Sequence, residues 1–230
     1  MDADLRQAQQ KARQAELELT KGECGLVLTD GTMELSCDFT ALLPRLRQDR
    51  LAHELLVRAA RIKGVTQAVV IDATAGLGED SLLLAAAGCK VLLFESDAVI
   101  AALLRDGLQR AANVPQLASI VARMQLFEKD SIDALPDWAN KVDVVYLDPM
   151  FPSRTKSAAA KKKFQLLHHL EQPCTDEVAL LYAALAANPR KVVIKRPIKA
   201  PTLAASRPSY SLSGKTVRFD VIVPPHTLSQ

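Results

Sequence analysis

The chain has 230 residues, enough for one catalytic domain and a small accessory segment. Hydrophobic residues make up 49% of it, but no uncharged apolar run approaches the roughly 20 residues that a membrane-spanning helix needs. The first residues are polar and lack the basic-then-apolar layout of a secretory signal, so we expect a soluble, cytoplasmic protein without a membrane partner.

The net charge of +3 conceals a strong asymmetry along the chain. Residues 1–148 hold 16 basic and 22 acidic side chains, whereas residues 149–230 hold 13 basic and 4 acidic ones. Such asymmetry indicates a polyanionic partner for the last third of the chain, although a solvated basic surface without a partner is the alternative.

The cysteines give no sign of a metal site. Cys24, Cys37, Cys89 and Cys174 lie far apart, without C-x-x-C spacing and without a histidine grouped to complete a zinc site. We therefore expect free thiols and no metal.

Residues 1–61 are interpreted as a small N-terminal segment. A polar stretch with good helix propensity covers residues 4–19. An Asp-Gly pair between two short apolar runs predicts a β-hairpin over residues 25–35, and leucines at helical spacing predict a helix over residues 49–60.

Residues 62–230 form the main domain, in which strand and helix patterns alternate. Short, all-apolar strands separated by helices indicate an α/β fold with a mostly parallel sheet and helices on both faces. Two final extended runs, 208–212 and 217–223, suit an antiparallel hairpin at the sheet edge and bring the total to seven strands. The other strands are expected at 68–73, 90–95, 124–128, 142–147 and 191–194, and the helices at 80–87, 99–112 and 176–187.

The first strand of this domain runs directly into a glycine-bearing turn and a helix start. In an open α/β sheet, ligands bind just beyond the carboxyl ends of the strands. The glycines allow a close approach of the backbone, while the acidic groups would repel a pyrophosphate and favour a cofactor with a sulfonium and an ammonium group. A serine also replaces the third glycine of the dinucleotide fingerprint. The candidate cofactor residues of this turn are Asp72, Gly76, Gly78, Glu79 and Asp80.

The next two strands also end in polar residues. Glu95 and Ser96 follow the second strand, where an acidic side chain can hold both ribose hydroxyls. Asp130 and Ser131 follow the third strand and are suitably polar for an adenine edge. Together the three strand ends predict a site for S-adenosylmethionine.

The fourth strand ends in Asp-Pro-Met-Phe-Pro, at residues 148–152. An aromatic amine is a poor nucleophile because its lone pair is delocalised into the ring. Asp148 and the Pro149 carbonyl could accept hydrogen bonds from such an amine and orient it toward a methyl group. Phe151 would give a flipped-out base a face to stack on, worth roughly 1–3 kcal/mol. The alternative is an ordinary Asp-Pro turn beside a core phenylalanine.

Basic side chains follow this motif directly and recur at the end of the fifth strand. Cations beside the proposed pocket suit a phosphate backbone and predict salt-sensitive binding, although each alone also fits a solvated surface. The candidate substrate-binding residues are Arg154, Lys156, Ser157, Lys161, Lys162, Lys195 and Arg196.

With these residues assembled, the chain resembles the small-subunit ribosomal RNA (guanine-N2)-methyltransferase family of type J. Besides the motifs above, the resemblance includes Asp38-Phe39, Ile62-Lys63-Gly64, residues 99–104, Lys156-Ser157-Ala158 and Lys195-Arg196-Pro197. The D-P-M-F-P stretch followed by K-S-A is its most specific part.

The resemblance implies a Rossmann-like class I methyltransferase fold with S-adenosylmethionine as cofactor. The chain departs from the family pattern at positions 79 and 96, where the family usually has Arg, and at residues 43–50, where it typically has a glycine- and arginine-rich segment. The implied cofactor contacts are Glu79, Asp80, Glu95, Ser96, Asp130, Ser131 and Asp148.

We therefore expect methyl transfer to the N2 amine of a guanine, with ribosomal RNA or the small ribosomal subunit as partner. One alternative keeps the cofactor but changes the acceptor to adenine N6 in nucleic acid or to a protein side chain. Another is a non-catalytic RNA-binding module that retains the fold. A nicotinamide-dependent oxidoreductase is the least favoured, given the acidic turn and the missing third glycine.

Overall fold

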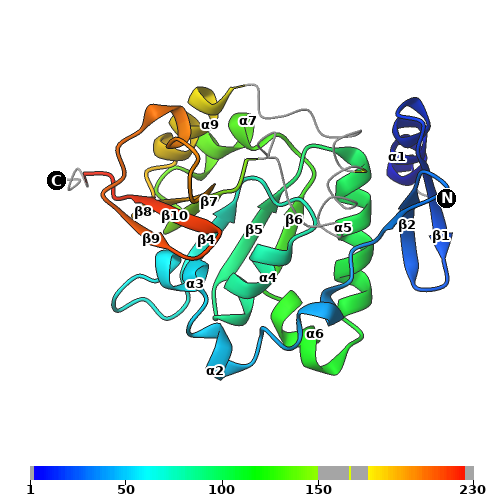
Figure 1. Ribbon diagram of the computed structural model, residues 1–230, viewed down its shortest axis with the longest axis horizontal. Coiled ribbons are helices and arrows are strands. Elements are labelled where there is room, and N and C mark those ends of the chain that lie inside the picture. The colour runs from blue at the N-terminus through cyan, green and yellow to red at the C-terminus, as the bar shows by residue number, and fades with distance from the viewer. Residues whose placement is uncertain (1–2, 150–165, 167–175, 226–230) are drawn as a thin grey trace.

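The structure, a computed structural model, describes residues 3–149, 166 and 176–225. Its largest element is a seven-stranded sheet (Figure 1). The strands are β4 (Val69–Asp72), β5 (Lys90–Phe94), β6 (Met124–Phe127), β7 (Val144–Leu147), β8 (Lys191–Pro197), β9 (Tyr210–Ser213) and β10 (Val217–Ile222).

The strands lie in the order β6-β5-β4-β7-β8-β10-β9. The first five run parallel to one another, whereas β10 is antiparallel to both β8 and β9. The prediction of a mostly parallel seven-stranded sheet with a C-terminal hairpin at its edge is confirmed. From β4 the chain adds β5 and β6 on one side and then β7 and β8 on the other, so the strand order reverses between β4 and β7. The carboxyl ends of these two strands therefore lie at a topological switch point, where such sheets bind ligands.

Helices cover both faces of this sheet, which explains why its central strands are apolar throughout. Alternate residues of one strand face opposite cores: Val144 and Tyr146 pack in one, Val145 and Leu147 in the other. The first core is covered by α3 (Leu55–Ala60), α4 (Glu79–Ala86), α5 (Ala98–Ala111) and α6 (Pro115–Val121); the second is covered by α7 (Ser131–Ala134), α9 (Glu177–Ala186), η2 (Leu135–Trp138) and η3 (Leu203–Ala205).

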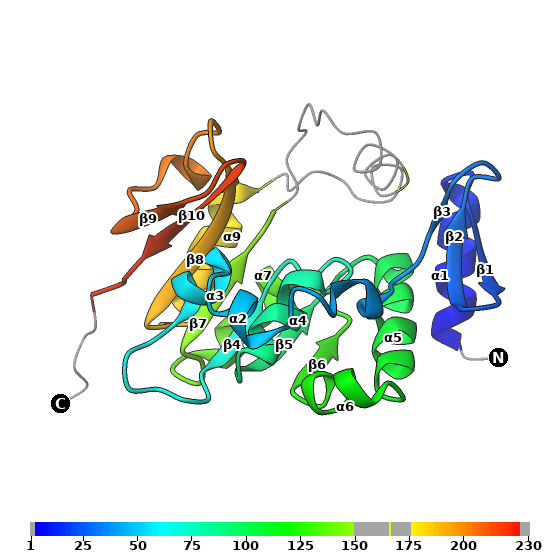
Figure 2. The same ribbon diagram turned by 60° about the horizontal axis from the view of Figure 1, so that its bottom comes forward.

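The N-terminal segment packs against the outer side of α5, at the opposite end of the molecule from the C-terminal hairpin (Figures 1 and 2). Its strands pair in the order β1-β2-β3, which confirms the predicted hairpin and adds β1, a strand that the sequence pattern did not predict. Ala8, Ala12 and Leu28 are fully buried in the same core as α5. The segment consists of α1 (Ala3–Gln14), β1 (Glu18–Gly22), β2 (Gly25–Thr29) and β3 (Glu34–Leu35).

Between this segment and the main sheet, the chain forms η1 (Phe39–Leu42), α2 (Gln48–Leu51) and α3. The single helix expected over residues 49–60 is thus two helices. The chain leaves helical geometry at Glu54, which has ψ 124° and whose carboxylate forms two hydrogen bonds with the Arg45 guanidinium, at 2.9 and 3.0 Å. The pairing of Glu54 with Arg45, nine residues earlier, therefore outweighs the helix propensity of the residues around Glu54.

Candidate active site

Carboxyl groups gather at the carboxyl ends of three adjacent strands. Asp72 is the last residue of β4, Glu95 follows β5 and Asp148 follows β7. Because these strands are neighbours in a parallel arrangement, the three side chains lie along one edge of the sheet.

The turn from β4 to α4 contains two glycines with different surroundings. Both have left-handed backbones, with φ 54° at Gly76 and φ 73° at Gly78. A β-carbon at Gly78 would lie 2.8 Å from Leu104 Cδ1, so this glycine is needed for close packing on α5. A β-carbon at Gly76 would meet nothing within 4 Å, so Gly76 borders open space that a ligand can enter.

Glu95 ties this turn to the end of β5. Its Oε2 accepts a hydrogen bond from the Gly76 N–H at 2.9 Å, and its Oε1 accepts one from the Asp97 N–H at 2.8 Å. Burial raises the pKa of Glu95 to about 7. A carboxylate offers about four acceptor positions, so Glu95 retains capacity for ribose hydroxyls after these two bonds.

Asp72 supports the same turn from the interior. It is 1% exposed, accepts a hydrogen bond from the Ser81 hydroxyl at 2.6 Å and a second from the Thr74 N–H at 3.2 Å. Burial raises its pKa to about 7 as well. Within this structure Asp72 therefore shapes the turn, and Gly76, which Glu95 holds, borders the open space.

The Asp148 turn is fixed directly to the glycine turn. The Asp148 N–H donates to the Thr74 hydroxyl at 2.6 Å, and the Ala73 N–H donates to the Tyr146 carbonyl at 3.0 Å. Pro149, the next residue, is buried. The predicted cofactor turn and Asp148, the first residue of the predicted reaction motif, thus lie side by side.

A lysine lies between two carboxylates of this site. Lys195 Nζ is 2.6 Å from Asp80 Oδ2 and 2.9 Å from Asp148 Oδ2, and the Tyr146 hydroxyl donates to the same Asp80 oxygen at 2.7 Å. The sequence analysis assigned Lys195 to the phosphate backbone of the substrate, whereas here its charge is engaged by Asp80 and Asp148.

The charges in this cluster shift one another's pKa values. Burial raises the pKa of Asp148, and the Lys195 ammonium offsets only part of that rise. Burial also acts on Asp80, but Lys195 and the Tyr146 hydroxyl outweigh it and lower the pKa of Asp80. In return, the two carboxylates overcome the burial of Lys195 and raise its pKa, so the lysine stays protonated.

The remaining predicted cofactor residues lie around this core with different exposure. Glu79 and Ser96 are exposed, at the start of α4 and the end of β5. Asp130 is exposed and caps α7 by accepting a hydrogen bond from the Ile132 N–H at 2.8 Å, while Ser131 is buried.

Arg196 does not join the site. It is 2% exposed, its Nε donates to the Pro201 carbonyl at 2.8 Å, and its Nη1 lies 3.5 Å from Glu177 Oε1. Adjacent strand residues point to opposite faces, so Lys195 and Arg196 cannot share one pocket. The other predicted residues of the reaction motif and the substrate cluster lie outside the described residues: Phe151, Arg154, Lys156, Ser157, Lys161 and Lys162.

Arg45 is a cation near the site that the sequence patterns did not single out. Arg45 lies in the segment before α2. Its pairing with Glu54 raises the pKa of its guanidinium, and the negative charges of Asp80 and Glu79 raise that pKa further. The one signal in the sequence was its place in residues 43–50, where the chain departs from the pattern of the family that it resembles.

The donor set fits S-adenosylmethionine. The strand ends and the start of α4 bring together four carboxyl groups, of which two pair with the Lys195 ammonium. This excess of carboxyl groups suits a cofactor bearing a sulfonium and an ammonium, and Gly76 leaves room for it. Among the described residues, no cluster of three or more His, Cys, Asp or Glu is arranged to hold a metal ion. Cys24 and Cys89 are free thiols, and the Cys37 thiol donates a hydrogen bond to the Leu77 carbonyl at 3.4 Å. In the part of the chain with assigned positions, no helix has the length and apolarity required to cross a membrane.

Comparison with known proteins gives the family. Residues 2–224 match the family model described as "Putative SAM-dependent methyltransferase". The ribosomal RNA small subunit methyltransferase J of Thioalkalivibrio sulfidiphilus is 45% identical over 202 residues, which is 86% of this chain and 79% of the relative. The protein of the same name from Stutzerimonas stutzeri is 41% identical over 219 residues, covering 92% and 85% of the two chains.

A solved structure agrees with the fold. The SAM-dependent methyltransferase from Neisseria gonorrhoeae superposes with a TM-score of 0.73 at 32% identity and covers 92% of this chain and 86% of its own. The fold is therefore the Rossmann-like class I methyltransferase fold, and the cofactor is S-adenosylmethionine. The chain belongs to the ribosomal RNA small subunit methyltransferase J family of S-adenosylmethionine-dependent methyltransferases.

Proposed function

We propose that this enzyme methylates the exocyclic N2 amine of a guanine in small-subunit ribosomal RNA. The substrate follows from the names of its relatives, and the chemistry follows from the site. The observation that carries the proposal is the position of Asp148, which is fixed by its N–H to Thr74 beside the cofactor turn and is paired with Lys195. The enzyme would act in the cytoplasm, where ribosomal RNA is found.

The cofactor supplies an electrophilic methyl group on its sulfonium when it is bound. The protein's part is to hold and orient the acceptor. Asp148 Oδ and the Pro149 carbonyl accept hydrogen bonds from the two amine hydrogens, which directs the nitrogen lone pair toward the methyl group and opposes the positive charge that develops. Lys195 favours the ionised form of Asp148, which this role requires.

The substrate contacts proposed beyond Asp148 come from the segment that follows it in sequence. Phe151 would stack on the flipped-out base, and the cations that follow would hold the phosphate backbone. These contacts are Arg154, Lys156, Ser157, Lys161 and Lys162.

The test is methyl transfer from labelled cofactor to small-subunit ribosomal RNA isolated from cells that lack this protein, followed by mapping of the modified base. We expect label at a guanine N2. Label at adenine N6 or on protein would replace the proposed acceptor. Cofactor binding without any transfer would instead support the non-catalytic RNA-binding alternative.

A substitution tests the role of Asp148. Asp148→Asn keeps the shape of the side chain but removes an ionised acceptor, and we expect kcat to fall by roughly 10²–10³-fold. Asp137→Asn is the matched control because Asp137 is an exposed aspartate of η2, outside the predicted site residues. If folded Asp148→Asn protein kept wild-type activity, Asp148 would have no part in the reaction.

A further inference from the structure

Exposed cations converge at the C-terminal edge of the main sheet from segments far apart in the sequence. Helix α3 packs against β8, β9 and β10. Lys191, at the start of β8, donates hydrogen bonds to the carbonyls of Ala59 and Arg61 at 3.2 and 2.7 Å, which joins the end of α3 to this edge. We name as the basic edge the six exposed residues Arg58, Arg61, Lys63, Lys199, Arg207 and Lys215.

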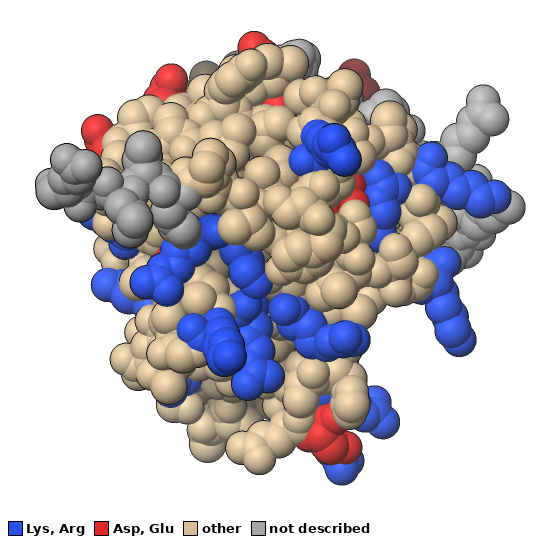
Figure 3. All heavy atoms as spheres, turned by 90° about the vertical axis from the view of Figure 1, so that its left-hand side faces the viewer, with Lys and Arg blue, Asp and Glu red and all other residues tan. Residues whose placement is uncertain are grey.

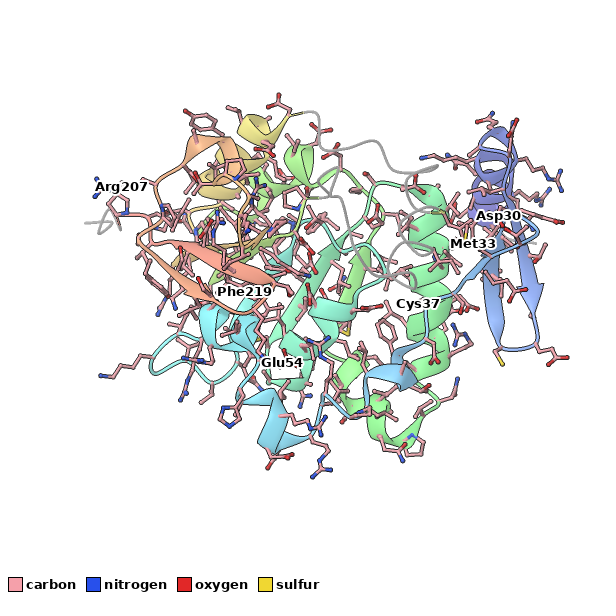
Figure 4. The ribbon with its side chains drawn as sticks, in the orientation of Figure 1. Asp30, Met33, Cys37, Glu54, Arg207 and Phe219 are labelled. Atoms are coloured by element: carbon pink, nitrogen blue, oxygen red, sulfur yellow. The ribbon has the colours of Figure 1, made fainter. Side chains whose placement is uncertain are left out.

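The space-filling view shows this side of the molecule directly. Lys and Arg side chains cross the middle of the face, and carboxylates appear mainly at its rim (Figure 3). Arg207 projects from the outer end of the C-terminal part, on the same side (Figure 4). The cations are therefore concentrated on one side of the molecule.

The positive charge of this surface is not neutralised by the part of the protein that surrounds it. Residues 190–225 contain eight Lys or Arg and one acidic residue, Asp220. Asp220 is 2% exposed and is engaged by the Arg218 guanidinium at 3.0 Å and the Ser211 hydroxyl at 2.6 Å. No residue of the basic edge forms an ion pair with a carboxylate of the described chain. Such a surface attracts an extended polyanion.

An exposed aromatic ring lies within this surface. Tyr210 begins the edge strand β9, is 40% exposed, and has Lys191 Nζ at 5.8 Å from its ring centroid. Exposed rings beside cations are platforms on which unpaired bases stack. Nucleic acid with unpaired bases therefore fits this surface better than a partner with phosphate charge alone.

Strand β8 connects the basic edge with the candidate active site along the chain. Lys195 holds Asp148, and Lys199 follows four residues later. The Ile198 N–H donates to the Thr216 carbonyl at 3.0 Å, so Lys199 lies beside the hairpin turn that carries Lys215. The surface runs from this end of β8 toward Lys191 at its start, a length of roughly 20 Å for seven residues of strand.

We propose that the basic edge binds the ribosomal RNA substrate outside the target nucleotide, with its cations on the phosphate backbone and Tyr210 stacked on an unpaired base. This proposal rests on the proposed function, because the RNA that enters the active site is the polyanion that the edge receives. The contacts fix the register of the RNA while the strand ends select and modify the base.

The charge is tested with two triple variants that each remove three cations. Lys199→Gln/Arg207→Gln/Lys215→Gln alters the edge, whereas Arg13→Gln/Lys21→Gln/Lys90→Gln removes three exposed cations elsewhere. Binding and methylation are measured on the same ribosomal RNA from cells that lack the protein. For the edge variant we expect at least a tenfold weaker Kd, a raised KM and kcat within twofold of wild type. The slope of log K against log salt should fall by about 2, since each phosphate that the variant can no longer neutralise accounts for about 0.7.

The stacking contact is tested separately at Tyr210. Tyr210→Ala should weaken RNA binding several-fold without changing the salt slope, and Tyr210→Phe should restore it. Affinity for S-adenosylmethionine and the thermal midpoint, measured on every variant, confirm that the fold and the cofactor site are intact.

The outcomes separate this proposal from the function. If wild type methylates the RNA but the edge and control variants have equal Kd, KM and salt slope, the basic edge is not an RNA surface. If wild type binds the RNA through the basic edge without methylating it, the RNA-binding proposal is supported and the proposed methylation of guanine N2 is refuted. If wild type neither binds nor methylates it, both proposals fail.

Discussion

Lys195 lies between Asp80 and Asp148, so its ammonium is the main influence that opposes the effect of burial on the pKa of Asp148. Lys195→Met should remove that influence and raise the pKa of Asp148 further. Because the carboxylate form accepts the amine hydrogens, activity should then be lost at a higher pH on the acid side of the profile. The measurement is kcat against pH for wild type, Lys195→Met and Lys195→Arg.

The arginine variant separates charge from structure, because it retains a cation near Asp148. Its acid limb should stay close to that of wild type, even if kcat falls at all pH values. An unchanged acid limb in Lys195→Met would show that Lys195 does not set the protonation of Asp148.

Glu95 should make cofactor binding depend on pH near neutrality. Burial raises its pKa to about 7, and ribose hydroxyls are better held by its ionised form. A raised carboxyl pKa means that the free site gains a proton as the pH falls, so affinity for S-adenosylmethionine should weaken by about tenfold between pH 8 and pH 6. Titration calorimetry at both values measures this change.

Asp72 has a similar pKa, so its contribution must be separated from that of Glu95. In Glu95→Gln the pH dependence should largely vanish, whereas in Asp72→Asn it should persist. Persistence of the full dependence in Glu95→Gln would place the titrating group elsewhere.

At the scale of elements, most of the main sheet could be predicted from the sequence, because short apolar runs and helical periodicity are local signals. The interruption of the helix expected over residues 49–60 and the formation of β1 depend on residues distant in the sequence, so they could not be predicted. Glu54 leaves the helix to pair with Arg45, and β1 forms only because β2 lies beside it. Helix α6, at Pro115–Val121, is short and has two residues of its seven in the core, which gives little periodicity to detect.

The packing of the N-terminal segment on α5 depends on Gly107. A β-carbon there would lie 2.3 Å from Cys37 Sγ and 3.0 Å from the Cys37 carbonyl oxygen, and Cys37 lies beside α5 (Figure 4). Gly107→Ala should therefore lower the free energy of unfolding by about 1–2 kcal/mol, although alanine favours the helix by about 1 kcal/mol. Urea denaturation measures the change, and Cys37→Ala in the same background should recover part of it. A stabilised Gly107→Ala protein would mean that the segment can shift freely away from α5.

At the scale of the whole molecule, the position of the candidate site could be predicted as far as the strand ends. Asp72, Glu95 and Asp148 were identified because ligands bind where parallel strands end. The sequence could not show that Lys195 faces Asp148 while Arg196 is buried, because that depends on which face of β8 packs against α9 and η3. The sequence analysis gave Thr74 no role of its own, and its hydrogen bond with the Asp148 N–H became visible only in the structure.

The N-terminal segment formed by α1 to β3 and the main sheet should unfold together. Leu28 of β2 is fully buried in the core that α5 shares with the main sheet, whereas Trp138, the one tryptophan of the chain, packs in the other core on the far face of that sheet. Leu28→Ala should lower the free energy of unfolding by about 2–5 kcal/mol. If unfolding is cooperative, the urea midpoint should fall equally by Trp138 fluorescence and by far-ultraviolet circular dichroism. A midpoint that shifts by circular dichroism while the Trp138 transition stays in place would instead show that the segment unfolds on its own, because only a shared core transmits the loss of a β2 side chain across the sheet.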